Sequence, residues 1–181
     1  MSILLFFDRV GKKISRSRRK AVFRRLIGCP HKDFSLVGEV TLINRRIKLG
    51  RGVTIYPGCM FFGDGPIEIG DNVNIGKDVI IYSSAEGGGV SIGSDTVIAA
   101  QSYIIDMDHG MAEGALIREQ PNTAAPVVIG RDCWLAANVT VLKGSRIGDG
   151  AVIGAKALVK GVIEPNSICV GVPARRIGAR K

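Results

Sequence analysis

Histidine and aromatic residues are scarce in this sequence. Its 181 residues contain two histidines and one tryptophan, and only 6% of them are aromatic. The two histidines exclude sites that need three imidazole ligands, and we expect no bound metal. No uninterrupted apolar run reaches the roughly 18 residues of a membrane-spanning helix, so we expect no such helix.

Cysteine is sparse as well. The four cysteines form no Cys-x-x-Cys pair and have no regular spacing, which predicts reduced thiols rather than a disulfide framework. The apolar run at residues 3–7 is short and has no positive charge before it, unlike a secretory signal. These features predict a cytoplasmic protein. Hydrophobic content of 46% and charged content of 23% exclude a disordered chain.

Positive charge is unevenly distributed. The net charge is +9, and residues 1–28 contribute nine basic residues against Asp8 alone. The rest of the chain is nearly neutral, which argues against a nucleic-acid-binding body.

Glycine is abundant, at 24 residues, and it follows a repeat. Aliphatic residues recur every six positions, usually with Gly or another small residue next and a small or β-branched residue four places on. The clearest run comprises Ile129, Leu135, Val141, Ile147, Ile153 and Val159. This period suits a solenoid in which each short strand directs one aliphatic side chain inward before the chain turns. We expect the glycines to relieve backbone strain at the turns.

The hexads extend from residue 49 to 163 and resemble those of the hexapeptide-repeat proteins. The resemblance implies an all-β fold, a left-handed parallel β-helix of triangular section, with roughly five coils. No hexad is readable between residues 106 and 128. A loop of this length in a compact solenoid is expected to carry function.

Three segments around this loop resemble motifs of hexapeptide acyltransferases that modify sugars. Residues 106–110 read Asp-Met-Asp-His-Gly, residues 119–121 read Glu-Gln-Pro, and residues 129–138 read Ile-Gly-Arg-Asp-Cys-Trp-Leu-Ala-Ala-Asn. The family has Asp-His-x-His-Gly in the first segment, so its general base falls on His109 and its first histidine is replaced by Met107. A base at this point suits acetyl transfer to a hydroxyl, and Asp106 or Asp108 could orient the imidazole.

The resemblance also implies acetyl-coenzyme A as co-substrate, a sugar or cell-surface glycan precursor as acceptor, and homotrimers with active sites between subunits. The residues expected to bind the coenzyme are Trp134, Ala136, Ala137 and Ala155 along the pantetheine arm, and Lys156, Lys160, Arg175 and Arg176 at the phosphates. The family's lysine in this last region is displaced by one position here. The stretch expected to bind the acceptor lacks the family's Asn, so Ser83, Ser84 and Glu86 are the candidates, with turn chemistry as the competing interpretation.

Other functions remain open on the sequence alone. The same base and donor could acetylate an amino sugar or inactivate a xenobiotic compound, and a non-catalytic, membrane-bound scaffold is a further alternative. A β-helical carbonic anhydrase is excluded because it needs three histidine ligands.

The N-terminal segment, residues 1–28, is predicted as a basic amphipathic helix. Its apolar stripe comprises Ile3, Phe7, Val10, Ile14, Ala21, Val22 and Leu26. The helix either docks on the inner face of an anionic membrane or only caps the first coil. An entry segment, residues 29–48, is expected between the helix and the repeats, and a basic tail, residues 164–181, after them.

Overall fold

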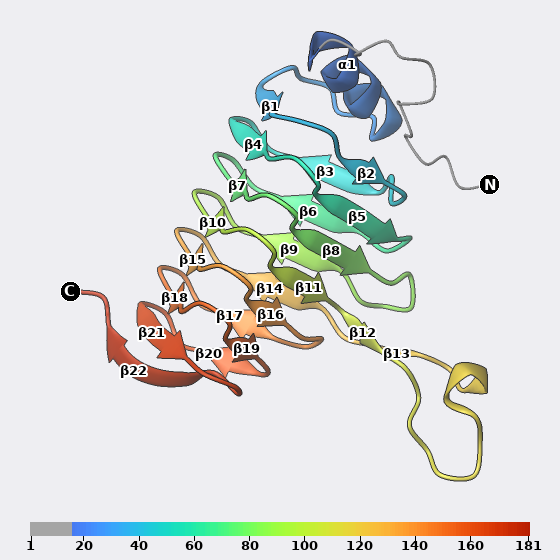
Figure 1. Cartoon of the computed structure of the whole chain (residues 1–181), viewed down its shortest axis with the longest axis vertical. Helices are drawn as coiled ribbons and strands as arrows, with labels where there is room; N and C mark the ends of the chain where they lie inside the picture. Colours follow the sequence, from blue (N-terminus) through green and yellow to red (C-terminus); the bar gives the residue numbers. More distant parts are fainter. Residues whose placement is uncertain (1–15) are drawn as a thin grey trace.

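The computed structural model describes residues 16–181 and shows a three-sided parallel solenoid (Figure 1). The strands of the solenoid pair in parallel with the strands of the coils before and after, so three sheets run along the length of the molecule. The predicted left-handed β-helix of hexapeptide repeats is confirmed. Within the described residues, no helix has the length and apolarity needed to span a membrane.

Three sheets form the sides of the prism. Sheet A contains β1 (Phe34–Leu36), β4 (Val53–Ile55), β7 (Asn74–Ile75), β10 (Val97–Ile98), β15 (Trp134–Leu135), β18 (Val152–Ile153), β21 (Ser167–Val170) and β22 (Arg175–Ala179). Sheet B contains β2 (Thr41–Leu42), β5 (Met60–Gly63), β8 (Ile80–Ser83), β11 (Tyr103–Ile105), β16 (Thr140–Val141) and β19 (Leu158–Val159). Sheet C contains β3 (Ile47–Leu49), β6 (Ile67–Ile69), β9 (Val90–Ile92), β14 (Val127–Ile129), β17 (Arg146–Ile147) and β20 (Val162–Ile163).

The aliphatic residues of the hexads form the core. In sheet A, Ile75 lies in register with Ile98, which in turn lies in register with Leu135, and all three are almost completely buried. Each such side chain contributes about 1.5–3 kcal/mol of burial energy. One inward residue per side fills the narrow prism, and the strands are short for this reason.

The glycines that follow these aliphatic residues were expected to relieve backbone strain at the turns, but the structure requires them for another reason. A Cβ at Gly50 would lie 2.4 Å from the carbonyl carbon of Gly70, and one at Gly93 would lie 2.5 Å from the nitrogen of Arg131. Close stacking of successive coils therefore demands glycine. The left-handed backbone at the corners falls two positions later, often on Asn or Asp, as at Asn72 and Asp95.

The solenoid has about seven coils rather than the roughly five expected. An additional coil, formed by β1, β2 and β3, occupies residues 34–49, where no hexad is apparent in the sequence. In this coil the buried side chain of Asn44 fills a corner, donating to the carbonyls of Phe62 and Gly65 and accepting from the amide of Arg46. At the other end, β22 folds back antiparallel on β21, so much of the predicted basic tail is part of sheet A.

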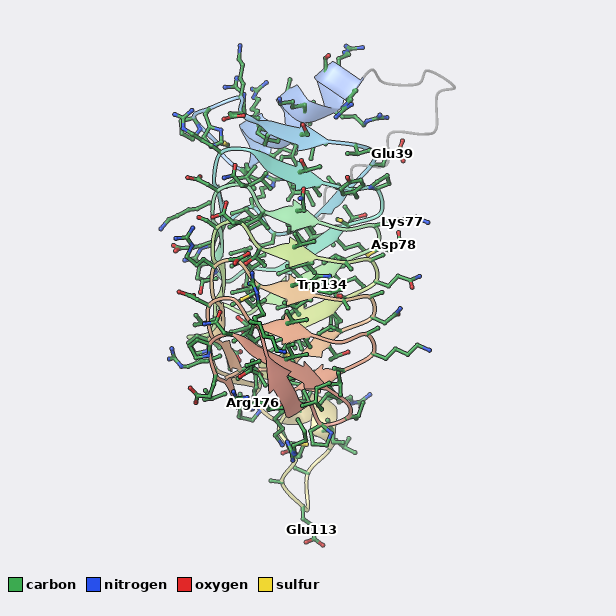
Figure 2. All side chains as sticks on the ribbon, turned by 90° about the vertical axis from the view of Figure 1, so that its left-hand side faces the viewer. Glu39, Lys77, Asp78, Glu113, Trp134 and Arg176 are labelled. Atoms are coloured by element: carbon green, nitrogen blue, oxygen red, sulfur yellow. The ribbon has the colours of Figure 1, made fainter. Side chains whose placement is uncertain are left out.

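The long loop leaves the solenoid between β11 and β14. Its base is a short antiparallel ribbon, in which β12 (Met107–Asp108) pairs with β13 (Thr123–Ala124), and a 3₁₀ helix, η1 (Ile117–Glu119), lies on the half of the loop that returns to β13. Glu113 marks the tip of the loop in Figure 2. Figure 1 shows the loop projecting well away from the prism.

Helix α1 (Arg16–Leu26) covers the N-terminal end of the solenoid (Figure 1). Phe23 is its buried residue, with ring centroids 5.9 Å from Phe34 and 6.3 Å from Phe61. The predicted stripe missed Phe23 and included Ala21, which is exposed. The members of that stripe before residue 16 lie outside the described residues. The capping role expected for this helix is therefore present over residues 16–26.

Candidate active site

His109 lies directly after β12, where the ribbon opens into the projecting loop. Its side chain is exposed and has no hydrogen-bond partner among residues 16–181. The residue in the position of the family's first histidine, Met107, is buried at the base of the ribbon. The imidazole is thus accessible to a molecule that approaches the loop.

Asp106, one of the two residues expected to orient the His109 imidazole, is completely buried. One carboxylate oxygen, Oδ2, accepts from the Ser83 hydroxyl at 3.0 Å and from the Gly89 amide at 2.5 Å. The other, Oδ1, accepts from the Ser84 amide at 2.8 Å. A Cβ at Gly88 would lie 2.2 Å from Oδ2. The carboxylate therefore anchors the 84–89 turn between sheets B and C, and it makes no hydrogen bond to His109.

Asp108 is held by Lys143, whose Nζ lies 3.2 Å from its Oδ2. The same ammonium donates to the carbonyl and the hydroxyl of Thr123 on the opposite strand of the ribbon. Lys143 follows β16 in the next coil, so this cluster ties the base of the loop to the solenoid. Lys143 could not be identified from the sequence, because its pairing with Asp108 depends on the stacking of coils.

Gln120 closes the loop internally. Its amide nitrogen donates to the carbonyls of Ala112 and Ala115 at 3.0 and 2.9 Å, and its oxygen accepts from the amide of Ala112 at 2.7 Å. A Cβ at Gly110 would lie 2.6 Å from the Gln120 Cβ. The Gln-Pro pair noted in the sequence thus packs against the residue next to His109.

Trp134 stands on the outer face of sheet A, between Val97 and Val152 in the neighbouring strands (Figure 2). It is 52% exposed, which is unusual for the largest apolar side chain in the protein. The predicted outward orientation is therefore present.

Four of the predicted coenzyme-binding residues gather at the corner between sheets A and B. Ala136 and Ala137 follow β15, Ala155 and Lys156 follow β18, and the Lys156 amide donates to the Ala137 carbonyl at 2.9 Å. Lys77 and Asp78 mark the same corner in Figure 2. The small alanine side chains leave an open edge with an exposed ammonium group beside it.

The remaining predicted cations are distributed differently. Arg175 and Arg176 are exposed at the start of β22, next to the last strand of the parallel stack in sheet A. Lys160 follows β19 and lies at the corner between sheets B and C. It is therefore separated by the width of sheet B from Lys156.

The predicted acceptor residues are mostly structural. Ser83 is completely buried, and the single hydrogen of its hydroxyl is shared between the Pro66 carbonyl at 2.9 Å and Asp106 Oδ2 at 3.0 Å. Ser84 is also buried, and its hydroxyl accepts from the amide of Glu86. These contacts argue against a sugar-binding role for either serine and favour turn chemistry. Glu86 is exposed and remains available to a ligand.

His109 and Trp134 are not brought together within one chain. His109 lies at the corner between sheets B and C, whereas Trp134 begins a strand of sheet A after the corner between sheets C and A. The projecting loop and the strands of sheet A lie on opposite sides of the molecule in Figure 1.

The cysteines do not offer an alternative nucleophile. All four are buried and free of disulfides. Burial raises the pKa of the Cys59 thiol to about 11 and also raises the pKa of Cys133, so both are protonated at neutral pH. Residues 16–181 also contain no group of three or more His, Cys, Asp or Glu side chains placed to hold a metal ion.

Comparison with known proteins places this solenoid in a family. The family described as "Bacterial transferase hexapeptide (six repeats)" matches residues 126–161, and that described as "Hexapeptide repeat of succinyl-transferase" matches residues 66–105. The putative acetyltransferase C18B11.09c of Schizosaccharomyces pombe is 30% identical over 162 residues, which cover 80% of this chain and 72% of that protein. The chain belongs to the hexapeptide-repeat acyltransferase family.

A second relative of this hexapeptide-repeat acyltransferase is the putative lipopolysaccharide biosynthesis O-acetyl transferase WbbJ of Escherichia coli. It is 40% identical over 124 residues, covering 64% of this chain. The match spans 62% of the length of WbbJ, so this chain covers less than two thirds of that relative.

The solved structures show the same fold. A variant of AntD, an N-acyltransferase from Bacillus cereus in complex with dTDP-4-amino-4,6-dideoxyglucose and coenzyme A, superposes with a TM-score of 0.72 and 21% identity. The superposition covers 82% of this chain and 81% of AntD. Because the identity is low, this likeness concerns the hexapeptide-repeat fold alone.

Proposed function

We propose that this protein transfers an acetyl group from acetyl-coenzyme A to a hydroxyl of a sugar in a glycan or glycan precursor. The observation that carries the proposal is an exposed imidazole, His109, at the mouth of a braced loop in a hexapeptide-repeat acyltransferase. The O-acetyl transfer named for WbbJ supports a hydroxyl acceptor.

His109 is assigned the role of general base. One imidazole nitrogen takes the proton of the acceptor hydroxyl as its oxygen attacks the thioester carbonyl carbon of acetyl-coenzyme A. The C–S bond then breaks, and the imidazolium returns the proton to the departing coenzyme A thiolate. Lys143 neutralises Asp108 and braces the ribbon, and Gln120 packs beside Gly110, so both act as positioning residues for His109. Because Asp106 and Asp108 have other partners, neither is assigned as the orienting group.

The edge between sheets A and B suits a coenzyme A molecule. Ala136, Ala137 and Ala155 present only small side chains along this edge, and the N–H groups of Ala137 and Ala155 have no hydrogen-bond partner among the described residues. These amides suit a narrow polar arm, and Trp134 offers an apolar surface nearby. Lys156 and Arg175 are exposed cations suited to phosphates. The donor supplies the activated acetyl group. Lys160 lies at another corner and would contact the phosphates only from a second subunit.

The active unit is proposed to be a homotrimer. His109 and Trp134 lie on different sides of one prism, so a complete site requires the loop of one subunit beside sheet A of the next. Sheet B offers an apolar outer face of partly buried side chains, comprising Met60, Phe62, Ile80, Tyr82, Tyr103 and Ile105. Such a face is suited to contact between subunits.

The first prediction concerns the two histidines. His109→Gln should lower kcat by about 10²–10⁴-fold, because the acceptor hydroxyl loses its base. The matched control is His31→Gln, since His31 lies near the capped end with Nε2 2.9 Å from the Leu49 carbonyl and should not affect turnover. The measurement is thiol release from acetyl-coenzyme A with a panel of sugar acceptors. Turnover unchanged in His109→Gln would remove His109 from the mechanism.

The bond formed is tested on the product. An acetyl ester is lost on brief treatment with mild alkali or hydroxylamine, whereas an acetamide survives. Loss of labelled acetyl from the product supports a hydroxyl acceptor. Retention would instead make the protein an N-acetyltransferase, and turnover of drugs but not of sugars would make it a xenobiotic acetyltransferase.

A further inference from the structure

The N-terminal end of the solenoid carries the net positive charge of the described residues. Residues 16–51 contain eleven Lys and Arg residues and only two acidic residues, whereas residues 52–181 contain eleven basic and thirteen acidic residues. Residues 16–51 form α1, the first coil and the turn that follows it, at one end of the molecule (Figure 1). The protein is therefore electrically polarised along its long axis.

Some of these cations hold the cap in place. Arg16 Nε donates to the Leu36 carbonyl at 3.0 Å, Arg19 lies 3.8 Å from Glu39, and the Lys20 ammonium is 4.9 Å from the centre of the Phe34 ring. With Phe23 buried beneath them, these contacts assign one face of α1 to packing.

Other cations at this end are exposed and have no side-chain partner among the described residues. They comprise Arg25 in α1, Lys32 before β1, Arg45 at the corner between sheets B and C, and Arg51 at the corner between sheets C and A. Val37 and Ile43, in turns of the same coil, are 39% and 37% exposed. The end thus presents exposed cations on the cap and at two corners, and two partly exposed apolar side chains in the same coil.

We infer that this end of the solenoid docks on the surface of an anionic lipid bilayer. Each cation held near such a surface strengthens binding by about fivefold, and the effect decays within a Debye length. Because the apolar face of α1 already covers the first coil, residues 16–26 attach by charge at the surface and do not insert their buried face. Capping and docking are therefore compatible roles of opposite sides of one helix.

A bilayer fits this end better than a nucleic acid does. Single strands are bound by exposed aromatic platforms, but the aromatic residues of this end, Phe23 and Phe34, are buried. The docking does not depend on the proposed activity. The trimer proposed above would strengthen it, since three parallel solenoids arranged around an axis along their length place three basic ends on one plane.

The test is cosedimentation of the full chain with vesicles of phosphatidylglycerol and phosphatidylcholine, or of phosphatidylcholine alone. The wild type should bind the anionic vesicles at about 0.1 M salt and release them at about 1 M, where the Debye length falls to about 3 Å. Arg25→Glu/Arg45→Glu should weaken this binding by about 25-fold or more.

The matched control is Arg146→Glu/Lys181→Glu, which changes the net charge equally at exposed positions outside the N-terminal end. It should bind vesicles nearly as the wild type does. Both variants should keep wild-type circular dichroism and wild-type turnover of a soluble acceptor, which separates docking from catalysis. If Arg25→Glu/Arg45→Glu does not fold, Lys32→Gln/Arg51→Gln serves as the second variant and should weaken binding similarly.

Four outcomes would overturn the inference. They are equal loss of binding in the N-terminal variant and its control, undiminished binding of the N-terminal variant, equal binding to neutral vesicles, and tighter retention on RNA or DNA than on anionic vesicles at the same salt concentration.

Discussion

At the scale of single residues, the two aspartates beside His109 have different surroundings although they are two positions apart. Asp106 is buried among the donors of the 84–89 turn, whereas Asp108 pairs with Lys143 near the surface. The sequence contains the motif and predicted the long loop, but it did not predict the hydrogen-bond and ion-pair partners of Asp106 and Asp108. Ser83 and Gly89 lie one coil before Asp106, and Lys143 lies one coil after Asp108, so the contacts follow from stacking and not from local sequence.

Replacing Asp106 by Asn tests this structural role. An amide keeps the shape but places an NH₂ group opposite the Ser84 or Gly89 N–H, so donors would face each other. The loss of charge-assisted hydrogen bonds in a buried site should cost about 2–3 kcal/mol of unfolding free energy, measured by denaturant unfolding.

Asp64→Asn is the control for Asp106→Asn. Asp64 accepts from the Ala85 amide at 3.0 Å in the same turn, but it is exposed, so its replacement should cost less than about 1 kcal/mol. Equal losses in the two variants would show that burial of Asp106 contributes nothing to stability.

At the scale of elements, the six-residue period predicted the solenoid well because one inward aliphatic residue per strand is a strict requirement of a narrow prism. It did not predict the first coil, in which a buried amide, Asn44, fills a corner that elsewhere takes a small side chain. The expectation that the glycines relieve backbone strain at the turns was also wrong in part. Gly50 is required by the backbone of the coil stacked against it, which no reading of a single hexad reveals.

Helix α1 lies within the predicted segment, and Leu26 of the predicted stripe packs against the core, but the stripe missed the buried Phe23. The predicted stripe takes its phase from residues 3–14, whereas the helix over Arg16–Leu26 turns Phe23 to the core. Phe23→Ala should therefore uncouple the cap, since removing a buried phenyl group costs about 3–5 kcal/mol. Hydrogen exchange should accelerate in β1 and β2 and stay unchanged in β16 and β17.

Val22→Ala, at the neighbouring half-buried position, serves as the control and should leave protection in β1 near the wild-type level. Uniform loss of protection along the whole solenoid in Phe23→Ala would contradict a local capping role and indicate one cooperative unit.

At the scale of the whole molecule, the family resemblance placed His109 and Trp134 in one site between subunits, and the two residues lie on different sides of a single prism. The motifs lie only 25 positions apart in the chain, yet the three-fold turn of each coil sends them to different sides. A site shared between subunits is the arrangement that reunites them, and it makes a prediction that a site within one chain does not.

Mixing two inactive variants tests this arrangement. His109→Gln and Trp134→Ala should each reduce activity severely as homo-oligomers, the first through kcat and the second mainly through KM for acetyl-coenzyme A. If each site takes His109 from one subunit and Trp134 from the next, random mixing of the two chains restores an intact pair in about one site in four. Coexpression should then recover about a quarter of wild-type kcat/KM, whereas the same purified variants combined without subunit exchange should recover none.

The control is coexpression of His109→Gln with Asp108→Asn/His109→Gln, in which no chain supplies the imidazole and no activity should return. Recovery absent from coexpressed, correctly assembled oligomers would place both side chains in the site of a single subunit or remove one of them from the site.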